Sequence, residues 1–542
     1  MDDRIPVNVK LNYLRTMRKT TVFWILLVLL AACKPDTKVK KMNLLFIMTD
    51  QQRYDALSIA GNGVLETPNL DRLAEQGAWF RNAYTPCAVC GPARSSILTG
   101  HIVEHTGVNT NGKTYYYDEE PVMTMPTFDE ILADNGYHCE YYGKWHSLTS
   151  HTEVYKNPKL ASRKGHSVFA HGGQRHVYID YLDEQVPVRE LKPGELYDTF
   201  TGRPYQTDPL DKYHGMTPEE FEKLDPRRVQ PDLHGRLMIP AEHTLTAFQA
   251  RETIDAIERL QDSTFSITCS FHFPHAPILP TDPYYNMYPA SEMSPPVSIH
   301  DMMDNSPYKR ANGRLGLPEY SDPELIKYMI SNYYGMVKEI DDWVGEILVT
   351  LDELGLTDNT LVIFTSDHGE MLGAHGLREK NIFYEESAHI PLMIRFPGEI
   401  EAGTEVDGYV SLVDLFPTIL DYLGIKPHAN DGVSLRGLME GTDHEYGKYV
   451  VTEWNYRGDV APNYMIVKDG WKLIVPYSKE SAVINALYDL NTDPHEMHNL
   501  IGKNPGREQY RPRAESLRKQ LLKWLEKNSS EHYKGVKERE LM

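Results

Sequence analysis

Thiols and long apolar stretches are both scarce in this chain. Five cysteines in 542 residues are too few for a disulfide framework, so the hydrophobic core has to hold the fold. The apolar run at 22–32 is too short to cross a bilayer comfortably as a helix. Positive charge is also in deficit, because 56 Lys and Arg residues face 77 Asp and Glu residues and leave a net charge of -21. That balance argues against a nucleic-acid partner, which usually meets a basic surface.

The length and composition are those of a large globular protein. A chain of 542 residues can bury a sizeable core and hold more than one domain. Its hydrophobic content of 41% and charged content of 25% are ordinary. The acidic total still allows a small basic pocket that binds an anionic substrate.

The N-terminus has the features of a secretion signal. Basic residues precede the apolar run at 22–32, which is typical of a signal h-region. The run ends in Leu30-Ala31-Ala32-Cys33, which is similar to a bacterial lipobox. We therefore expect a lipoprotein signal peptide over 1–33, lipidation of Cys33, and a periplasmic or cell-surface protein with a lipid anchor. An ordinary signal peptide is the alternative, and translation that starts at Met17 would shorten the segment before the run.

A cysteine opens the most informative stretch, residues 90–100. Pro92 suits the first turn of a helix, which would place Cys90 at the positive end of the helix dipole, where an anion is favoured. Arg94 would lie one turn further on. Cys87 and Cys90 also form a C-x-x-C pair, so a redox couple and half of a zinc site are alternative interpretations. No second pair of this kind follows.

The string Cys90-x-Pro92-x-Arg94, followed by Ser-Ser-Ile-Leu-Thr-Gly, resembles the signature of the sulfatase family. In that family a maturation enzyme oxidises the cysteine to formylglycine, an aldehyde whose hydrate is the nucleophile. The resemblance implies formylglycine at Cys90 and makes Arg94 the anchor of the nucleophile. Ala93 stands where many members have Ser, which affects which maturation enzyme is used.

Two apolar runs, 43–48 and 360–366, predict buried parallel strands that each lead to an acidic residue. Ligands bind at the carboxyl edge of such sheets, so Asp50 and Asp367 can converge on one cation there. Oxygen-rich ligation favours Ca²⁺, with Mn²⁺ or Mg²⁺ as alternatives. The resemblance implies five metal ligands: Asp50, Gln51, Cys90, Asp367 and His368.

Gln51 departs from the pattern of many family members, which have a second Asp at this position. An amide carbonyl can still bind a hard cation, with less negative charge. The Asp-Gln pair resembles a branch that also includes choline sulfatases and phosphonate monoester hydrolases.

Three further strings match the family. Gly143-Lys144-Trp145-His146 follows a predicted strand at 138–142, and Pro274-His275-Ala276-Pro277 follows another at 264–270. The third is Lys380 before Tyr384-Glu385. The resemblance implies that Lys144 and Lys380 bind the sulfate, that His275 protonates the leaving alcohol and that His146 handles the proton of the hydrate.

Two other histidines have no assigned role. His389 stands where many relatives have Arg before Val-Pro-Leu, so its function is open. His272 lies three residues before His275 and has no support from a family motif.

The resemblance spans about residues 43–500 and implies an alkaline-phosphatase-like α/β fold. We expect a large mixed, mostly parallel sheet flanked by helices, and a small C-terminal antiparallel α+β subdomain. The expected segments are the catalytic domain 34–445 with insertion loops 150–245, the subdomain 446–530 and a charged tail 531–542. Loops over an active-site mouth usually set specificity. Candidate substrate contacts in these loops are His166, His171, Arg175 and His176.

These observations predict a sulfuric ester hydrolase whose partner is a sulfated oligosaccharide. Family likeness favours a glycosaminoglycan, with a uronate 2-O-sulfate as the expected position. Two alternatives are a phosphonate or phosphate diester hydrolase with the same constellation, and a catalytically dead, glycan-binding lipoprotein.

Overall fold

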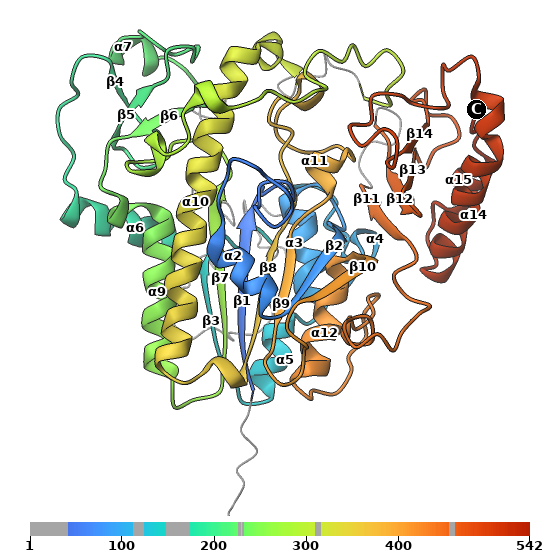
Figure 1. The fold of residues 1–542 in the computed structure, drawn as a ribbon, viewed down its shortest axis with the longest axis horizontal. Helices are drawn as coiled ribbons and strands as arrows, with labels where there is room; N and C mark the ends of the chain where they lie inside the picture. Colours follow the sequence, from blue (N-terminus) through green and yellow to red (C-terminus); the bar gives the residue numbers. More distant parts are fainter. Residues whose placement is uncertain are drawn as a thin grey trace, which may run out of the picture. The chain divides into compact units, whose positions relative to one another are not determined.

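A seven-stranded sheet lies at the centre of the part of the chain that the structure describes. The computed structural model describes residues 42–111, 124–147, 173–225, 229, 232–308, 316–454 and 461–542. The sheet order is β10-β2-β9-β8-β1-β7-β3, as Figure 1 shows. Only the pairs that involve β9 are antiparallel, so the predicted mixed, mostly parallel sheet is confirmed. Its strands are β1 (Asn43–Asp50), β2 (Ala78–Tyr84), β3 (His138–Gly143), β7 (Phe265–Pro274), β8 (Thr360–Ser366), β9 (Leu392–Arg395) and β10 (Thr404–Ser411).

Helices cover both faces of this sheet, which explains why its central strands are apolar throughout. Side chains alternate between the two faces of a strand. Along β1, Leu44 and Phe46 belong to the core beneath α3, α5 and α12, whereas Leu45 and Ile47 belong to the core beneath α2, α9 and α10. These helices are α2 (Pro68–Glu75), α3 (Cys90–Thr99), α5 (Phe128–Asp134), α9 (Leu245–Leu260), α10 (Pro323–Glu353) and α12 (Leu415–Tyr422).

The segment 150–245 contains more regular structure than the predicted loops. Three short strands, β4 (Glu195–Tyr197), β5 (Pro204–Thr207) and β6 (Gly235–Leu237), form an antiparallel sheet. Strands of three or four residues are too short to show an alternating pattern in the sequence. The helices α6 (Gly173–Gln185) and α7 (Pro218–Phe221) belong to the same region.

Several expectations fall outside what the structure describes. The signal peptide and Cys33 lie outside the described residues, as do the candidate contacts His166 and His171. The side chains of Arg175 and His176 are likewise not described. Among the described helices, none combines the length and hydropathy that a membrane span requires.

The C-terminal part carries the predicted antiparallel sheet. Its strands β11 (Val450–Glu453), β12 (Tyr464–Lys468), β13 (Trp471–Val475) and β14 (Ala486–Asp489) pair in that order, and α14 (Arg511–Lys527) packs against them. The segment 531–542 contains α15 (Tyr533–Glu538) and buries Val536 and Leu541. The remaining short helices are α4 (Val103–Thr106), α11 (Glu385–Ala388) and α13 (Arg436–Met439).

A buried lysine connects this C-terminal sheet to the catalytic part of the chain. Lys472 on β13 is fully buried, and its ammonium lies 2.7 Å from Glu385 and 2.8 Å from Glu496. It also donates a hydrogen bond of 2.8 Å to the carbonyl oxygen of Phe383. These contacts hold the segment that follows Lys380.

Glu339 on α10 gives a prediction for stability. It is 3% exposed and accepts a hydrogen bond from Thr244, and burial raises its pKa to about 8. The folded state therefore keeps a proton that the unfolded state loses above about pH 4.5, so stability falls as pH rises towards 8. In Glu339→Gln this dependence should disappear. Between about pH 5 and 8, the free energy of unfolding of the variant should therefore rise relative to that of the wild type by about 1.4 kcal/mol per pH unit. Melting temperatures of both proteins between pH 5 and 8 check this, and parallel curves would contradict it.

Candidate active site

Four predicted ligands lie together at the carboxyl edge of the central sheet. Asp50 ends β1, and Asp367 and His368 directly follow β8. Because Thr49 pairs with Ser366 in the parallel ladder, the two carboxylates are carried to neighbouring positions. The donor atoms of Asp50, Cys90, Asp367 and His368 all lie within 4.8 Å of one another.

Cys90 is the first residue of α3, as the sequence predicts. Its sulfur lies 3.0 Å from His368 Nε2 and 4.0 Å from Asp50 Oδ1. Burial and then Asp50 oppose ionisation of the thiol, yet the surrounding cations, with Lys144 first, lower its pKa. Burial instead raises the pKa of Cys87 well above its usual range. Cys87 also lies outside the metal-binding group found among the described residues, so a zinc half-site is not supported.

Arg94 joins the two carboxylates from within α3. Its side chain is fully buried, with Nε 2.7 Å from Asp367 Oδ2 and a terminal nitrogen 3.0 Å from Asp50 Oδ2. The other terminal nitrogen donates to the Lys144 carbonyl at 2.7 Å and to the Ser270 hydroxyl at 2.8 Å. Arg94 therefore fixes the distance between the carboxylates and ties them to the helix of the nucleophile.

The donor set fits a divalent cation. Two carboxylates and one imidazole suit Ca²⁺, Mn²⁺ or Mg²⁺. His368 Nδ1 lies 2.9 Å from the Gly369 carbonyl, so in the neutral ring it carries the proton and Nε2 faces the site with its lone pair. Although burial opposes it, Asp367 raises the pKa of His368 to about 9, which shows how strongly this position attracts positive charge.

Cationic side chains surround the same point. The Lys144 ammonium lies 2.5 Å from Asp50 Oδ2 and 3.7 Å from the Cys90 sulfur. The Lys380 ammonium lies 2.8 Å from His275 Nε2, and that nitrogen lies 4.0 Å from Asp50 Oδ1. Burial raises the pKa of Asp50, but Lys144, followed by His275 and Arg94, outweighs burial and holds it well below its usual range.

Both predicted proton-handling histidines belong to this group. His146 is 2% exposed, and burial, Lys144 and Arg94 hold its pKa well below the usual range. Burial and then Lys380 lower the pKa of His275 in the same way. The structure thus brings Lys144, Lys380 and His275 to the group of Arg94 and the metal-binding side chains, and it buries His146 within electrostatic range of Lys144 and Arg94.

Gln51 contacts this group through its amide. Its carbonyl oxygen accepts a hydrogen bond of 2.5 Å from the Lys380 ammonium, and its backbone N–H donates to Asp367 Oδ1 at 3.1 Å. The position is compatible with metal ligation, which stays a prediction. The amide nitrogen donates in the opposite direction, to Glu370.

Sequence reasoning missed three contributors to the site. The amide oxygen of Asn111 accepts the backbone N–H of Gly91 at 2.9 Å, beside the nucleophile, and no motif signals it. The ring of His272 lies 5.3 Å from that of His275 and stacks on Phe200. Glu370 ends the string that starts at Asp367, and its place after a buried strand was the only available signal.

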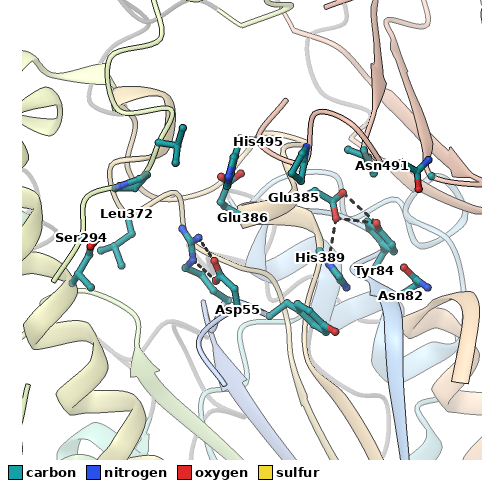
Figure 2. Close-up of a pocket in the computed structure, with 18 of the residues that line it drawn as sticks. Asp55, Asn82, Tyr84, Ser294, Leu372, Glu385, Glu386, His389, Asn491 and His495 are labelled. Carbon is teal, nitrogen blue, oxygen red and sulfur yellow. Dashed lines mark hydrogen bonds and ion pairs between the residues drawn. The ribbon is translucent and has the colours of Figure 1, made fainter. Parts of the chain in front are cut away.

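His389 has a structural position away from the nucleophile. Its ring stacks between Tyr54 and Tyr84, with centroid distances of 3.9 and 5.0 Å. Its Nδ1 lies 3.1 Å from Glu385 Oε2, and Nε2 lies 2.8 Å from the Arg81 carbonyl oxygen. Figure 2 shows Glu385 directed at both His389 and Tyr84.

These rings line a cavity of about 580 Å³ that is separate from the catalytic group. Its lining includes Glu385, Glu386 and His389 but none of the predicted catalytic or metal-binding residues. The group around Cys90 combines convergent charges with a thiol, and these features, rather than cavity size, are typical of a reactive site.

Comparisons with known proteins identify the family. The family model described as Sulfatase matches residues 42–425. The chain belongs to the sulfatase family. A second model, described as N-sulphoglucosamine sulphohydrolase, C-terminal, matches residues 373–527 of this sulfatase. The enzyme is therefore a sulfuric ester hydrolase.

Similar proteins extend over most of the sulfatase. An arylsulfatase from Clostridium perfringens is 29% identical over 512 residues, which cover 92% of this chain and 97% of the relative. An N-acetylglucosamine-6-O-sulfatase from Bacteroides thetaiotaomicron is 29% identical over 523 residues, which cover 88% of this chain and 85% of the relative. The phosphonate monoester hydrolase of Agrobacterium radiobacter shares the fold, with a TM-score of 0.69 and 24% identity. The match covers 90% of this chain and 96% of the hydrolase.

Arg94→Lys should inactivate this sulfatase. A lysine would keep the positive charge, but one ammonium cannot reach two carboxylates, a carbonyl and a hydroxyl at once, so buried acceptors would be left without a donor. We expect a loss of about 3–5 kcal/mol in the free energy of unfolding and of about 100-fold or more in kcat/KM.

Arg81→Lys is the matched control for this experiment. Its pair with Glu405 has the same distance of 2.7 Å, but both side chains are about half exposed, at 49% and 58%. Urea unfolding should show a change within about 0.5 kcal/mol for this variant. Equal effects of the two substitutions would contradict the central role of Arg94.

Proposed function

We propose that this sulfatase removes sulfate from a sulfated glycan after Cys90 has been converted to formylglycine. The convergence of Cys90 with Asp50, Asp367 and His368 carries this proposal. Formylglycine would supply the attacking hydroxyl as its hydrate, and a divalent cation held by the two carboxylates and His368 would polarise a sulfate oxygen. Arg94 would keep these groups in register with the nucleophile.

The lysines would compensate charge on the sulfuryl group. Lys144 directly follows β3, Lys380 lies in the segment between β8 and α11, and both are buried. A buried ammonium interacts with a developing negative charge much more strongly than an exposed one. His146, two residues after Lys144, would take a proton from the hydrate.

His275 and Lys380 would act together on the leaving alcohol. His275 Nδ1 lies 2.7 Å from the Ala276 carbonyl oxygen and donates to it, so Nε2 accepts a hydrogen from the Lys380 ammonium. A proton for the leaving oxygen is thus stored on this pair. The low pKa of His275, caused by burial and then by Lys380, makes its imidazolium a strong acid once formed.

The substrate assignment rests on relatives. The relative named N-acetylglucosamine-6-O-sulfatase acts on a sulfated amino sugar, which supports a glycosaminoglycan-type substrate. We propose that the hydrolysed ester is the 2-O-sulfate of a uronate. The 6-O-sulfate of a glucosamine is the alternative ester. The fold shared with a phosphonate monoester hydrolase keeps phosphonate and phosphate diesters as the alternative substrate class.

We also propose that the protein is lipidated at Cys33 and held at the periplasmic membrane or the cell surface. The lipobox-like string at the end of the apolar run supports this placement. An extracytoplasmic location would give the enzyme access to glycans that do not enter the cell.

A panel of defined substrates tests the proposed function. Sulfate release should be fastest from a disaccharide with a uronate 2-O-sulfate, and slower from its glucosamine 6-O-sulfate isomer. Aryl sulfate should exceed an aryl phosphonate monoester by at least about tenfold in kcat/KM. A preference for the phosphonate would assign the chain to the alternative class. Binding of sulfated glycans without any hydrolysis would indicate a dead, glycan-binding lipoprotein.

The state of residue 90 can be checked directly. Mass spectrometry of the peptide that contains this position, after expression with a maturation enzyme, should show an aldehyde in place of the thiol. Cys90→Ala cannot form this group, and we expect kcat to fall by about 10⁴-fold or more while the fold is kept. Full activity of the unmodified thiol form would refute the proposed nucleophile.

A further inference from the structure

Glu370 is a buried acid to which no catalytic or metal-binding role has been assigned. It is 1% exposed and lies three residues after Asp367. One carboxylate oxygen, Oε1, accepts the backbone N–H groups of Leu372 at 3.0 Å and Glu379 at 2.6 Å. The other, Oε2, accepts the amide nitrogen of Gln51. Both oxygens of this buried group are therefore hydrogen-bonded, as burial requires.

These bonds leave only one orientation for the Gln51 amide. A lysine ammonium can only donate and an ionised carboxylate can only accept. Because Lys380 lies at one end of the amide and Glu370 at the other, the carbonyl oxygen has to face Lys380 and the NH₂ group has to face Glu370.

The backbone of Gln51 is held as firmly as its side chain. It has a positive φ of 72°, which is unusual for a residue with a side chain. Its N–H donates to Asp367 Oδ1 at 3.1 Å, and its carbonyl oxygen accepts the Tyr333 hydroxyl at 2.7 Å. The side chain thus starts from a fixed point beside the metal-binding group.

We propose that Glu370 is a positioning residue that holds the carbonyl oxygen of Gln51 towards the catalytic group. There the oxygen binds Lys380 and is available to the divalent cation. The inference rests on the proposed function, because it assigns a role within that site. It also explains the amide at position 51, since a carboxylate there would face Glu370 across a buried contact, where like charges repel strongly.

The substitution Glu370→Gln separates this role from simple packing. The two backbone N–H groups of Leu372 and Glu379 would fix the single remaining oxygen, so the new NH₂ group would face the NH₂ group of Gln51. Two donors cannot bond each other, and the Gln51 amide would have to flip. Its NH₂ group would then face the Lys380 ammonium and the cation, which both need an acceptor.

The swap variant Q51E/E370Q should restore the lost interactions. The amide at 370 would donate to one oxygen of the carboxylate at 51, and the other oxygen would accept from Lys380. Packing volumes barely change in this exchange, so rescue reports hydrogen-bond polarity rather than shape. E386Q is the matched control, because Glu386 is a half-buried glutamate that lines the separate cavity.

The experiment measures binding of Mn²⁺ and Ca²⁺ by calorimetry to the matured, metal-stripped protein, together with aryl sulfate turnover and melting temperature. E370Q should weaken metal binding by about 10–100-fold, and kcat should fall with it. The swap variant should recover metal affinity to within about threefold of the wild type, and E386Q should leave it unchanged. If E370Q does not fold, the swap variant alone tests the proposal. The proposal then requires that the swap variant folds and binds metal.

A double-mutant cycle completes the test. If Glu370 acts through Gln51, E370Q should have little further effect on metal affinity in a Q51A background. Additive losses, an unchanged affinity in E370Q, or a swap variant no better than E370Q would each overturn the proposal. Metal affinity does not depend on which ester is hydrolysed, so failure of the proposed substrate and failure of this inference give different results.

Discussion

The site depends on one buried guanidinium. Arg94 binds Asp50 at the end of β1, Asp367 after β8, the Lys144 carbonyl after β3 and Ser270 on β7. A single side chain from α3 thus contacts the carboxyl ends of β1, β3 and β8 and one residue within β7. Buried ion pairs give little net stability, because desolvation offsets much of the attraction. Their value here is geometric, since the helix that begins at Cys90 and both carboxylates share one anchor.

The charge around Cys90 differs in sign from the net charge of the chain. The chain carries a net charge of -21, yet the residues around Cys90 include Arg94, Lys144 and Lys380. Arg94 and Lys144 pair with Asp50 and Asp367, whereas Lys380 lies against the uncharged amide of Gln51 and the ring of His275. Three cations thus face two carboxylates in this group, which leaves positive charge in excess. At physiological salt, exposed charges are screened beyond about 8 Å, so the acidic surface does not cancel the local field. A small anion can therefore bind inside an acidic protein.

The sequence predicted those parts of the site whose position follows from a strand end or a family motif. Asp50 and Asp367 follow apolar runs, and parallel pairing alone is enough to bring such strand ends together. Glu370 and Asn111 could not be assigned in this way, because their roles depend on contacts to Gln51 and Gly91 that only the folded chain reveals. The three-stranded sheet of β4, β5 and β6 escaped prediction because strands of three or four residues are too short to show an alternating pattern in the sequence.

His389 shows a second limit of sequence reasoning. The position differs from the family pattern in the sequence, but its aromatic stack is formed with Tyr54, which follows β1, and Tyr84, which ends β2. Both tyrosines are distant from His389 in the chain. The same contacts shape a cavity that a motif search has no means to detect.

The contacts of Lys472 have a consequence for the way such enzymes evolve and can be engineered. Its ammonium binds Glu385, Glu496 and the Phe383 carbonyl, so the C-terminal sheet supports the stretch that carries Lys380. A truncation before β11 would remove the buried cation that Glu385 and the Phe383 carbonyl bind, so the C-terminal sheet is not a detachable module. Exchanging C-terminal segments between relatives would therefore require this lysine and its two glutamates to be transplanted as one unit.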